Sequence, residues 1–375
     1  MGFLAARLFS GETVDQRIAR VGQTSGFDYL RLALALAVIL WHSFHVTHEQ
    51  ADVVRMSSGY YRPMMAIVLP MFFALSGFLV AGSLVRTNSL VVFLTLRALR
   101  IFPALTVEIL LSALILGPLV TTENLHTYLS GREFWNYFLN ILGLIHYTLP
   151  GVYSGNIVPK LVNLSLWTIP FELECYIVIS VLFAVGLTSR WKHLFLPMVL
   201  TAIVCLTLWS LRPAVMKVSG PVYGRALVLS FLLGVALYLY RERVVLNGFL
   251  AALAAVASIV LLSIPPLAPF SVVPAAYLTV YLGMLTPPRV WLIRTGDYSY
   301  GLYLFAFPLQ QLHVYLMNNR AGMLANYAFS VVLCLGYAAF SWHCVEKPIL
   351  SRKTMVIGFI QRALGHFARP ANVPT

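Results

Sequence analysis

Four ionisable side chains share one face of an apolar stretch near the N-terminus, which reads FDYLRLALALAVILWHSFHVTH over residues 27–48. Arg31 and His42 are eleven residues apart, which places them about 20° from each other around a helix; Asp28 and His45 lie on the same side. His42 lies roughly 21 Å further along the helix axis than Asp28. An ionisable group at membrane depth costs several kcal/mol or more, so His42 is a candidate functional residue.

Two other interpretations of these histidines remain open. His42, His45 and His48 follow one another at intervals of three and could ligate a metal ion, although His48 falls in the predicted loop and no cysteine or carboxylate cluster accompanies it. A histidine in a helix core can also be a neutral ring with one hydrogen bond. We favour a functional role for His42, because the face carries further charges at membrane depth, where ionisable groups usually have a function.

A second polar ridge lies in SLWTIPFELECY, residues 165–176. Ser165, Thr168, Glu172 and Tyr176 recur at helical spacing, and Pro170 predicts a kink there because proline removes a backbone donor. A carboxylate at this depth suits a residue that handles a proton or orients a histidine. The alternative for Glu172 is an ion pair that holds helices together.

Two arginines stand one helical turn apart in LRALRIFP, residues 96–103. The guanidinium groups of Arg97 and Arg100 would project side by side, and such a pair suits phosphate or pyrophosphate recognition. Cytoplasmic anchoring by positive charge is the alternative, and the spacing alone favours it.

Hydroxyl and amide side chains also gather in DYSYGLYLFAFPLQQ, residues 297–311. Tyrosines at a membrane boundary are usually interfacial anchors, but glutamines deeper in a helix need hydrogen-bond partners. We therefore predict that Tyr300, Tyr303 and Gln310 belong to the substrate site.

The composition requires a membrane for this chain. Of its 375 residues, 59% are hydrophobic and 10% charged, with a mean hydropathy of +0.82. Soluble proteins carry about 25% charged residues, so a soluble enzyme, a nucleic-acid binder and a disordered scaffold are excluded. The net charge of +13 comes mostly from bases between apolar runs, as positive-inside loops require. The four cysteines lie within apolar segments at spacings that suit neither zinc nor disulfides.

Eleven apolar segments are candidates to cross the membrane. They are 27–46, 64–85, 101–120, 134–150, 165–187, 193–211, 224–240, 245–264, 270–286, 297–317 and 323–344. The distribution of Lys and Arg favours ten crossings, with both termini cytoplasmic and with 134–150 as a re-entrant or interfacial helix. We predict an all-α bundle of about ten transmembrane helices over residues 27–350, an amphipathic cytoplasmic segment at 1–26 and a cytoplasmic tail at 351–375.

Six strings in this order resemble acyltransferase family three, the bacterial membrane O-acyltransferases of polysaccharides and lipid-linked sugars. They are FDYLRLALALAVILWHS, MFFALSGFLV at 71–80, LRALRIFP, SLWTIPFELECY, DYSYGLYLFAFPLQQ and VEKP at 345–348. The resemblance implies a ten-helix domain that uses acyl-CoA, usually acetyl-CoA, as co-substrate and binds no permanent cofactor. Two departures are visible: Phe305 and Ala306 occupy a stretch where relatives often carry a histidine, and many relatives append a periplasmic domain, whereas this chain stops at residue 375.

The resemblance also implies roles for individual residues. His42 takes the place of the catalytic base, and Glu172 is expected to orient it. Arg97 and Arg100 are linked to donor binding, with Arg31 assisting. Trp167, Tyr176 and Ser76 fall in or near the substrate site.

The predicted activity is transfer of an acyl group, usually acetyl, from acyl-CoA to a sugar hydroxyl of a cell-surface or lipid-linked glycan at the bacterial cytoplasmic membrane. The partners expected are the donor, the glycan and the bilayer, with no nucleic acid. A proton-coupled transporter of a small solute or acyl donor is the rival, because polar stripes and proline-broken helices also describe carriers. A different membrane acyl- or glycosyltransferase is a third possibility. The order of the motifs and the lack of visible repeats favour the O-acyltransferase.

Overall fold

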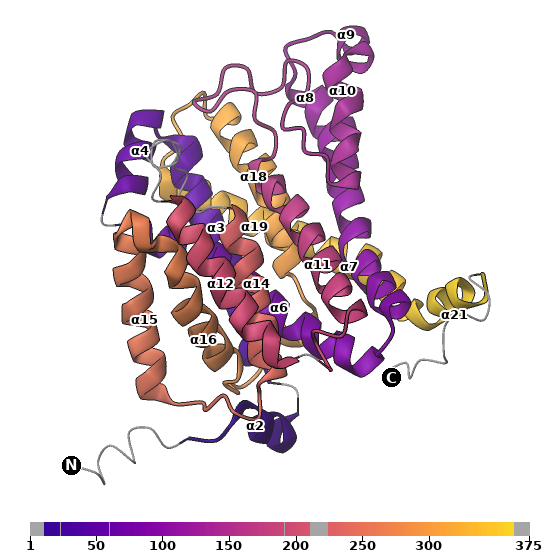
Figure 1. The fold of residues 1–375 in the computed structure, drawn as a ribbon. Helices are drawn as coiled ribbons and strands as arrows, with labels where there is room; N and C mark the ends of the chain where they lie inside the picture. Colours follow the sequence, from indigo (N-terminus) through magenta and orange to yellow (C-terminus); the bar gives the residue numbers. More distant parts are fainter. Residues whose placement is uncertain (1–10, 23, 60, 191, 211–223, 364–375) are drawn as a thin grey trace. The chain divides into compact units, whose positions relative to one another are not determined.

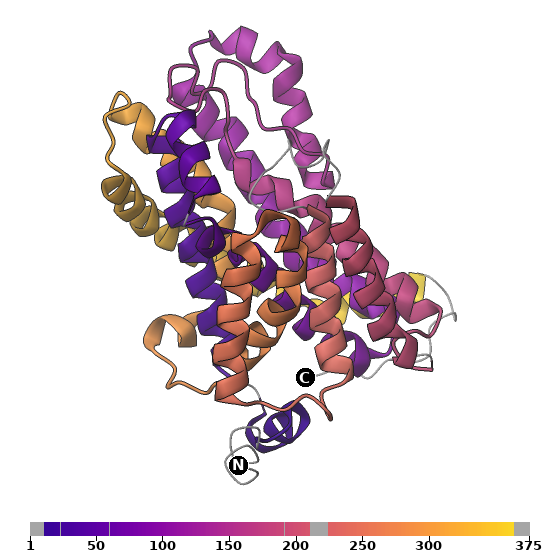
Figure 2. The same cartoon turned by 60° about the vertical axis from the view of Figure 1, so that its left-hand side comes forward.

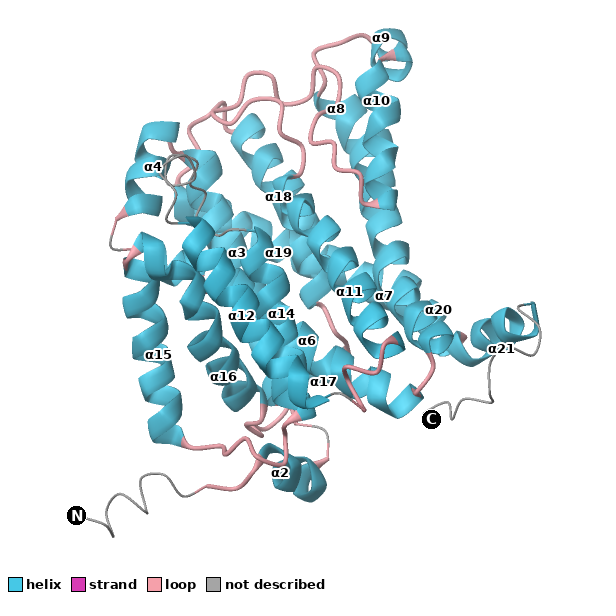
Figure 3. Ribbon diagram, viewed as in Figure 1, coloured by secondary structure: helices cyan, strands magenta, loops and turns pink. Residues whose placement is uncertain are grey.

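Helices account for all the regular structure of the described chain (Figure 3). The computed structural model describes residues 11–22, 24–59, 61–190, 192–210 and 224–363. Within these ranges there is no strand, only the isolated bridges Thr13–Val245 and Thr121–Val152. The predicted all-α class is therefore confirmed.

Six helical stretches of the described chain are long and apolar enough to cross a membrane. They are Gly26–Thr47, Arg62–Thr87, Leu90–Val120, Leu164–Ala184, Pro265–Gly283 and Met323–Ser351, and three shorter apolar helices cover Lys192–Leu208, Gly224–Leu239 and Gly248–Ser263. The count of ten crossings and the orientation of the termini stay predictions. The segment 134–150 does not form one helix: α10 (Arg132–Tyr137) leads into a 3₁₀ helix, η2 (Phe138–Leu142), and irregular chain follows.

The chain divides into two compact units, each assembled from three stretches. The first unit contains 1–34, 56–86 and 174–294, and the second contains 35–55, 87–173 and 295–375. The division cuts through α3 (Gly26–Thr47), α4 (Gln50–Ser58) and α11 (Ile169–Ala184). The predicted boundaries at residues 26 and 350 remain untested, and parts of both predicted terminal segments, 1–10 and 364–375, lie outside the described residues.

Close contact between helices characterises the first unit. Its helices are α2 (Val14–Val21), α5 (Arg62–Ala66), α6 (Val68–Thr87), α12 (Lys192–Ser210), α14 (Gly224–Leu239), α15 (Gly248–Ser263), η4 (Pro265–Ser271), α16 (Val272–Gly283) and the first residues of α17 (Trp291–Thr295). Helices α12, α14, α15 and α16 run side by side (Figures 1 and 2). A Cβ atom at Gly77 would collide with the Phe231 carbonyl, and one at Gly234 with the Ala74 carbonyl. Small residues thus let the backbones of α6 and α14 approach each other.

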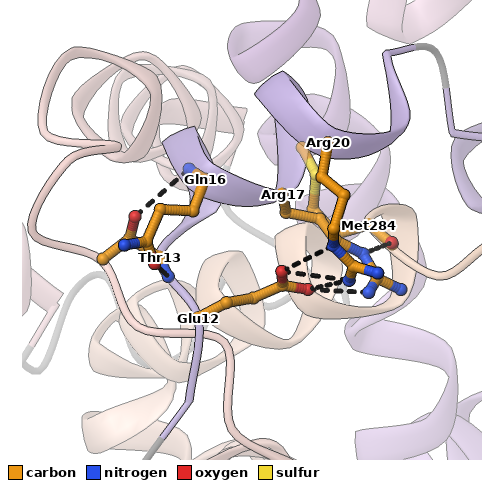
Figure 4. Close-up of polar contacts among 6 residues, drawn as sticks. All are labelled: Glu12, Thr13, Gln16, Arg17, Arg20 and Met284. Atoms are coloured by element: carbon orange, nitrogen blue, oxygen red, sulfur yellow. Dashed lines mark hydrogen bonds and ion pairs between the residues drawn. The ribbon is translucent and has the colours of Figure 1, made fainter.

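Helix α2 is held to the first unit by a buried apolar side and by polar contacts, among them the bond from Nε of Arg17 to the Met284 carbonyl (3.2 Å; Figure 4). Val14 is fully buried, and a capping box formed by Thr13 and Gln16 begins the helix. Glu12 accepts hydrogen bonds from Arg17 (2.7 Å) and Arg20 (2.7 Å), and the bond from Arg20 is the main cause that lowers the pKa of Glu12. Helix α2 thus lies within the predicted N-terminal segment 1–26, whose amphipathic and cytoplasmic character stays a prediction.

In the second unit, irregular helical turns interrupt the long helices. Helix α7 (Leu90–Leu111) continues through a π-helical turn, η1 (Ser112–Leu116), into α8 (Gly117–Val120), and α19 (Met323–Phe340) continues through a second one, η5 (Ser341–Glu346), into α20 (Lys347–Ser351). The other elements are α9 (Leu125–Ser130), α10, η2, η3 (Leu164–Thr168), α18 (Ser299–Leu316) and α21 (Lys353–Ala363). Helices α18 and α19 pack along each other. Both π turns carry polar side chains of the candidate site, which is a common location for such turns.

Candidate active site

His42 is enclosed by protein in the second unit. Only 7% of the residue is exposed, and its ring meets the ring of Phe307 on α18 edge-on, with 5.3 Å between centroids. Among the described residues the Nδ1 atom is buried and has no hydrogen-bond partner. The ring therefore faces protein, as a stripe of ionisable residues at membrane depth requires.

The helical turn that carries His42 is fastened by an amide from α18. Gln310 donates from Nε2 to the Ile39 carbonyl (2.7 Å) and to the Ser43 hydroxyl (2.8 Å), and it is fully buried. These acceptors stand three residues before and one residue after His42. The assignment of Gln310 to the substrate site stays a prediction, but its amide nitrogen is already used to hold this turn.

A second amide, absent from the sequence prediction, supports Gln310. Asn326 on α19 donates to the Gln310 carbonyl (3.0 Å) and lies 3.3 Å from Nδ1 of His313, and both residues are buried. His313 stacks on Phe329 with centroids 4.5 Å apart. In the sequence, Asn326 and His313 are marked only as single polar residues within apolar runs. Such a mark is weak evidence for a site, because the sequence does not show which partner each side chain has.

Pro308 opens α18 where it passes the histidine. Proline has no N–H, so the Leu304 carbonyl loses its helical partner. Asn163 replaces that partner, because its Nδ2 donates to the Leu304 carbonyl (2.8 Å). The Pro308 carbonyl accepts from the Tyr153 hydroxyl (3.0 Å). The irregular segment before η3 thus completes the hydrogen bonding of the broken helix.

Glu108 is a buried carboxyl group that the sequence analysis missed. It is fully buried on α7, and its Oε1 accepts from Ser112 (2.8 Å) and from Nδ2 of Asn163 (2.9 Å). Its Oε2 and the Tyr137 hydroxyl have no hydrogen-bond partner among the described residues. The rule that intramembrane acids are functional candidates should have singled out Glu108 in TVEILL.

Arg100 forms a compact ion cluster with two acids. Its guanidinium donates to Oε2 of Glu346 (2.6 Å) and to Oδ2 of Asp297 (2.6 Å). Glu346 also accepts from Ser341, and Asp297 from Ser299. The guanidinium carbon lies 5.5 Å from the ring centre of Tyr300 and 5.9 Å from that of Trp342. Asp297 of DYSYG and Glu346 of VEKP therefore both contact Arg100 of LRALRIFP in the fold.

Arg97, one turn earlier on α7, has different surroundings. Within the described part of the chain it makes no ion pair, and its Nε is buried without a hydrogen-bond partner. Its guanidinium carbon lies 6.0 Å from the centre of the Phe93 ring. The two arginines therefore share a helix face but not an environment.

Glu172, at the start of α11, acts electrostatically on Arg100 and on the Tyr303 hydroxyl. Tyr303 shares a hydrogen bond with Thr168 (2.7 Å) and donates to the Ser165 carbonyl (3.1 Å). Trp167 lies next to this ridge, with its ring 5.9 Å from that of Phe171. The predicted pairing of Glu172 with His42 is untested, and its electrostatic neighbours include Arg100 and Tyr303.

Three predicted site residues belong to the first unit. Arg31 lies 3.9 Å from Asp28, Tyr176 packs edge-on against Phe231 and Ser76 is half-buried on α6. Their relation to His42 stays a prediction. No group of three His, Cys, Asp or Glu that could hold a metal occurs in the ranges the structure describes, and Nδ1 of His48 lies 3.1 Å from the Phe44 carbonyl.

Comparison with known proteins adds to this geometry. The sequence model of a family described as "Acyltransferase domain" matches residues 24–343. Nodulation protein 10 of Rhizobium leguminosarum bv. viciae is 28% identical over 90% of this chain and 96% of its own length. An O-acetyl transferase of Shigella phage Sf6 is 24% identical over 88% of this chain and 96% of its own length. No solved structure matches. With its six long apolar helices and a family match over most of its length, the chain is a multi-pass membrane protein that belongs to acyltransferase family three.

Proposed function

We propose that this protein transfers an acetyl group from acetyl-CoA to a sugar hydroxyl of a cell-surface or lipid-linked glycan, with His42 as the general base. The observation that supports this proposal most is that the imidazole of His42 is buried and that its Nδ1 has no hydrogen-bond partner among the described residues. The helical turn that carries this ring is held by a hydrogen bond from Gln310. The phage relative is named as an O-acetyl transferase, which supports acetyl as the group transferred.

The reaction needs a base and little else from the chain. A sugar hydroxyl is a weak nucleophile, and an imidazole can take its proton while the oxygen attacks the thioester carbonyl. The carbon–sulfur bond then breaks, and the proton on the imidazolium passes to the departing CoA thiolate. The imidazole is left neutral, and no external oxidant, reductant or metal is consumed.

Rigid placement of the imidazole supports this role. A base must lie within hydrogen-bond reach of the proton it removes, and small displacements of catalytic groups are costly. The bonds from Gln310 to Ile39 and Ser43, with Asn326 behind them, restrict the turn of α3 that carries His42. Phe307 limits the tilt of the ring from one side.

The test is replacement of His42 in a strain that lacks the chromosomal copy. We expect His42→Ala to lower the acetyl ester content of surface glycans, measured by mass spectrometry, to the level of the deletion strain, because loss of a general base costs roughly 10²- to 10⁴-fold in rate. His48→Ala, one residue beyond the end of the same helix, is the matched control, and immunoblots of membranes must show equal protein. Unchanged ester content with His42→Ala would exclude His42 as the base. Solute flux without any change in esters would favour a carrier.

A further inference from the structure

The two arginines of LRALRIFP differ in how much of their charge is already neutralised. Arg100 touches two carboxylates at 2.6 Å each, and Glu172 adds a third negative charge at longer range. Arg97, among the described residues, has no acidic partner and a buried Nε without a hydrogen bond. From the sequence the two arginines of this helix face look equivalent. In the described part of the fold, Arg100 is paired with carboxylates and Arg97 is not.

The surroundings of Arg100 disfavour an additional anion. A phosphate there would meet the carboxylates of Asp297 and Glu346, whose two negative charges outweigh the single positive charge of the guanidinium, so it would be repelled unless it drew the guanidinium away from one of them. Glu346 is 1% exposed, so its carboxylate would be left buried and unpaired, which is strongly unfavourable. The positive charge of Arg100 is thus already neutralised by carboxylates of the protein itself.

The same cluster ties together three segments of the second unit. Arg100 comes from α7, Glu346 from η5, and Asp297 from the residues that begin α18, where its Oδ1 accepts from both the amide and the hydroxyl of Ser299. Gly296 is part of this junction, because a Cβ there would collide with the ring of Trp342. Since α18 carries Gln310, the cluster fixes one end of the helix that holds the His42 turn.

We propose that only Arg97 of this pair binds a phosphate of the acyl-CoA donor, and that Arg100 is a positioning residue which, with Asp297 and Glu346, fixes the start of α18. This assignment rests on the proposed function, since it takes acyl-CoA as the donor. The recognised chemistry is a phosphate or diphosphate group, and the unpaired guanidinium of Arg97 supplies the charge-assisted hydrogen bonds.

The first arm of the test measures donor binding to the full chain in lipid nanodiscs by calorimetry. The ligands are acetyl-CoA and acetyl-pantetheine, which keeps the thioester but has no phosphate. We expect Arg97→Gln to weaken acetyl-CoA roughly 10- to 100-fold, the range for losing a hydrogen-bonded charge, and to leave acetyl-pantetheine unchanged. Arg97→Lys should recover part of the loss. Arg55→Gln is the control, because Arg55 is exposed and pairs with Asp52.

The second arm removes all three charges of the cluster together, as Asp297→Asn, Arg100→Gln and Glu346→Gln in one chain. The single change Arg100→Gln would leave two unpaired carboxylates and endanger folding, whereas the triple variant keeps the shapes without the charges. We expect acetyl-CoA affinity to stay within about twofold of wild type, since no phosphate ligand is lost. Turnover should fall and the melting temperature should drop, because the start of α18 is loosened.

Each outcome decides between the assignments. Equal acetyl-CoA affinity in wild type and Arg97→Gln would overturn the assignment of phosphate binding to Arg97 but not the proposed function. Arg97 would then be a topological anchor. A triple variant that loses affinity for acetyl-CoA but not for acetyl-pantetheine would make Arg100 a phosphate ligand and also overturn it. If wild type binds no acetyl-CoA, the proposed function fails and the assignment fails with it.

Discussion

The two compact units bury their polar side chains in opposite ways. In the first unit, buried hydroxyls mostly bond to their own helix: Ser230, Ser258 and Thr279 each donate to the carbonyl four residues earlier. In the second unit, buried carboxyl, amide and guanidinium groups bond across segments, as Glu108 and Arg100 do.

Buried polar atoms without partners follow the same division. Of those recorded in the described residues, all but the Thr188 hydroxyl belong to the second unit, and they include atoms of His42, Arg97 and Gln310. A buried polar atom without a partner costs free energy unless water or a ligand satisfies it. The contrast teaches that the first unit is built for close packing, whereas the second accepts the cost of polar burial where the candidate site lies.

The largest effect is expected from breaking the close packing of the first unit. Gly77→Val places a side chain against the Phe231 carbonyl, where backbone cannot give way, so we expect destabilisation of more than about 3 kcal/mol and little folded protein. The measurement is the yield and melting temperature of detergent-purified protein. Gly336→Val on α19, where nothing lies within 4 Å of the added Cβ, is the matched control. Wild-type stability of Gly77→Val would mean that α6 and α14 do not pack as described.

Next in size is removal of the buried acid of the second unit. Glu108→Ala leaves the Asn163 amide and the Ser112 hydroxyl without their acceptor, so we expect a loss of about 2–4 kcal/mol in unfolding free energy. Glu108→Gln keeps an acceptor of the same shape and should recover most of it. Chemical denaturation followed by tryptophan fluorescence measures the difference, with exposed Glu123→Ala as control. Equal stability of Glu108→Ala and wild type would show that the buried hydrogen bonds of Glu108 do not stabilise the second unit. The contrast between the two units would then not extend to this network.

A change that spares the fold but moves the histidine should separate activity from stability. Gln310→Leu keeps the volume of the side chain but loses the bonds to Ile39 and Ser43, so we expect kcat to fall roughly 10- to 100-fold, as small displacements of catalytic groups do. The KM for acetyl-CoA should not change, because Gln310 is remote from the proposed phosphate ligand in sequence and role. Gln50→Leu, exposed on α4, is the control. A rise in KM with normal kcat would instead place Gln310 in the donor site.

How far the sequence predicts this molecule depends on whether a feature is local. Apolar run length locates several helices to within a few residues: 27–46 is observed as Gly26–Thr47 and 224–240 as Gly224–Leu239, although α7 begins at Leu90, well before the predicted 101–120. The interruption at 134–150 follows from its asparagines, since Asn140 Nδ2 donates to the Tyr137 and His146 carbonyls and stops the helix. The division into two units could not be predicted, because it depends on packing between segments far apart in the chain.

The site was predicted unevenly for the same reason. Helical periodicity places Arg97 and Arg100 on one face, but only the tertiary fold brings Asp297 and Glu346 to one of them. Single acids and amides in apolar runs, such as Glu108 and Asn326, carry no spacing pattern and are visible only through their partners. Motif order was therefore informative about the family, whereas partner identity needed the fold.

The smallest effect is expected at the solvent-facing edge of the first unit, where Glu12 joins Arg17 and Arg20 (Figure 4). Because the folded-state pKa of Glu12 is lowered below its ordinary value, its contribution is complete at neutral pH and is lost as the pH falls through that lowered value. Hydrogen exchange of peptide 11–22, corrected for the intrinsic rate at each pH, should therefore rise in acid for wild type. Glu12→Gln should show the faster exchange already at neutral pH and little further change, whereas exposed Glu49→Gln should behave as wild type. The effect is small because the carboxylate is only half-buried, and solvent screens such pairs. Matching pH profiles for wild type and Glu12→Gln would show that α2 is held without Glu12, by buried Val14 and by its bonds to Arg241 and to the Met284 carbonyl.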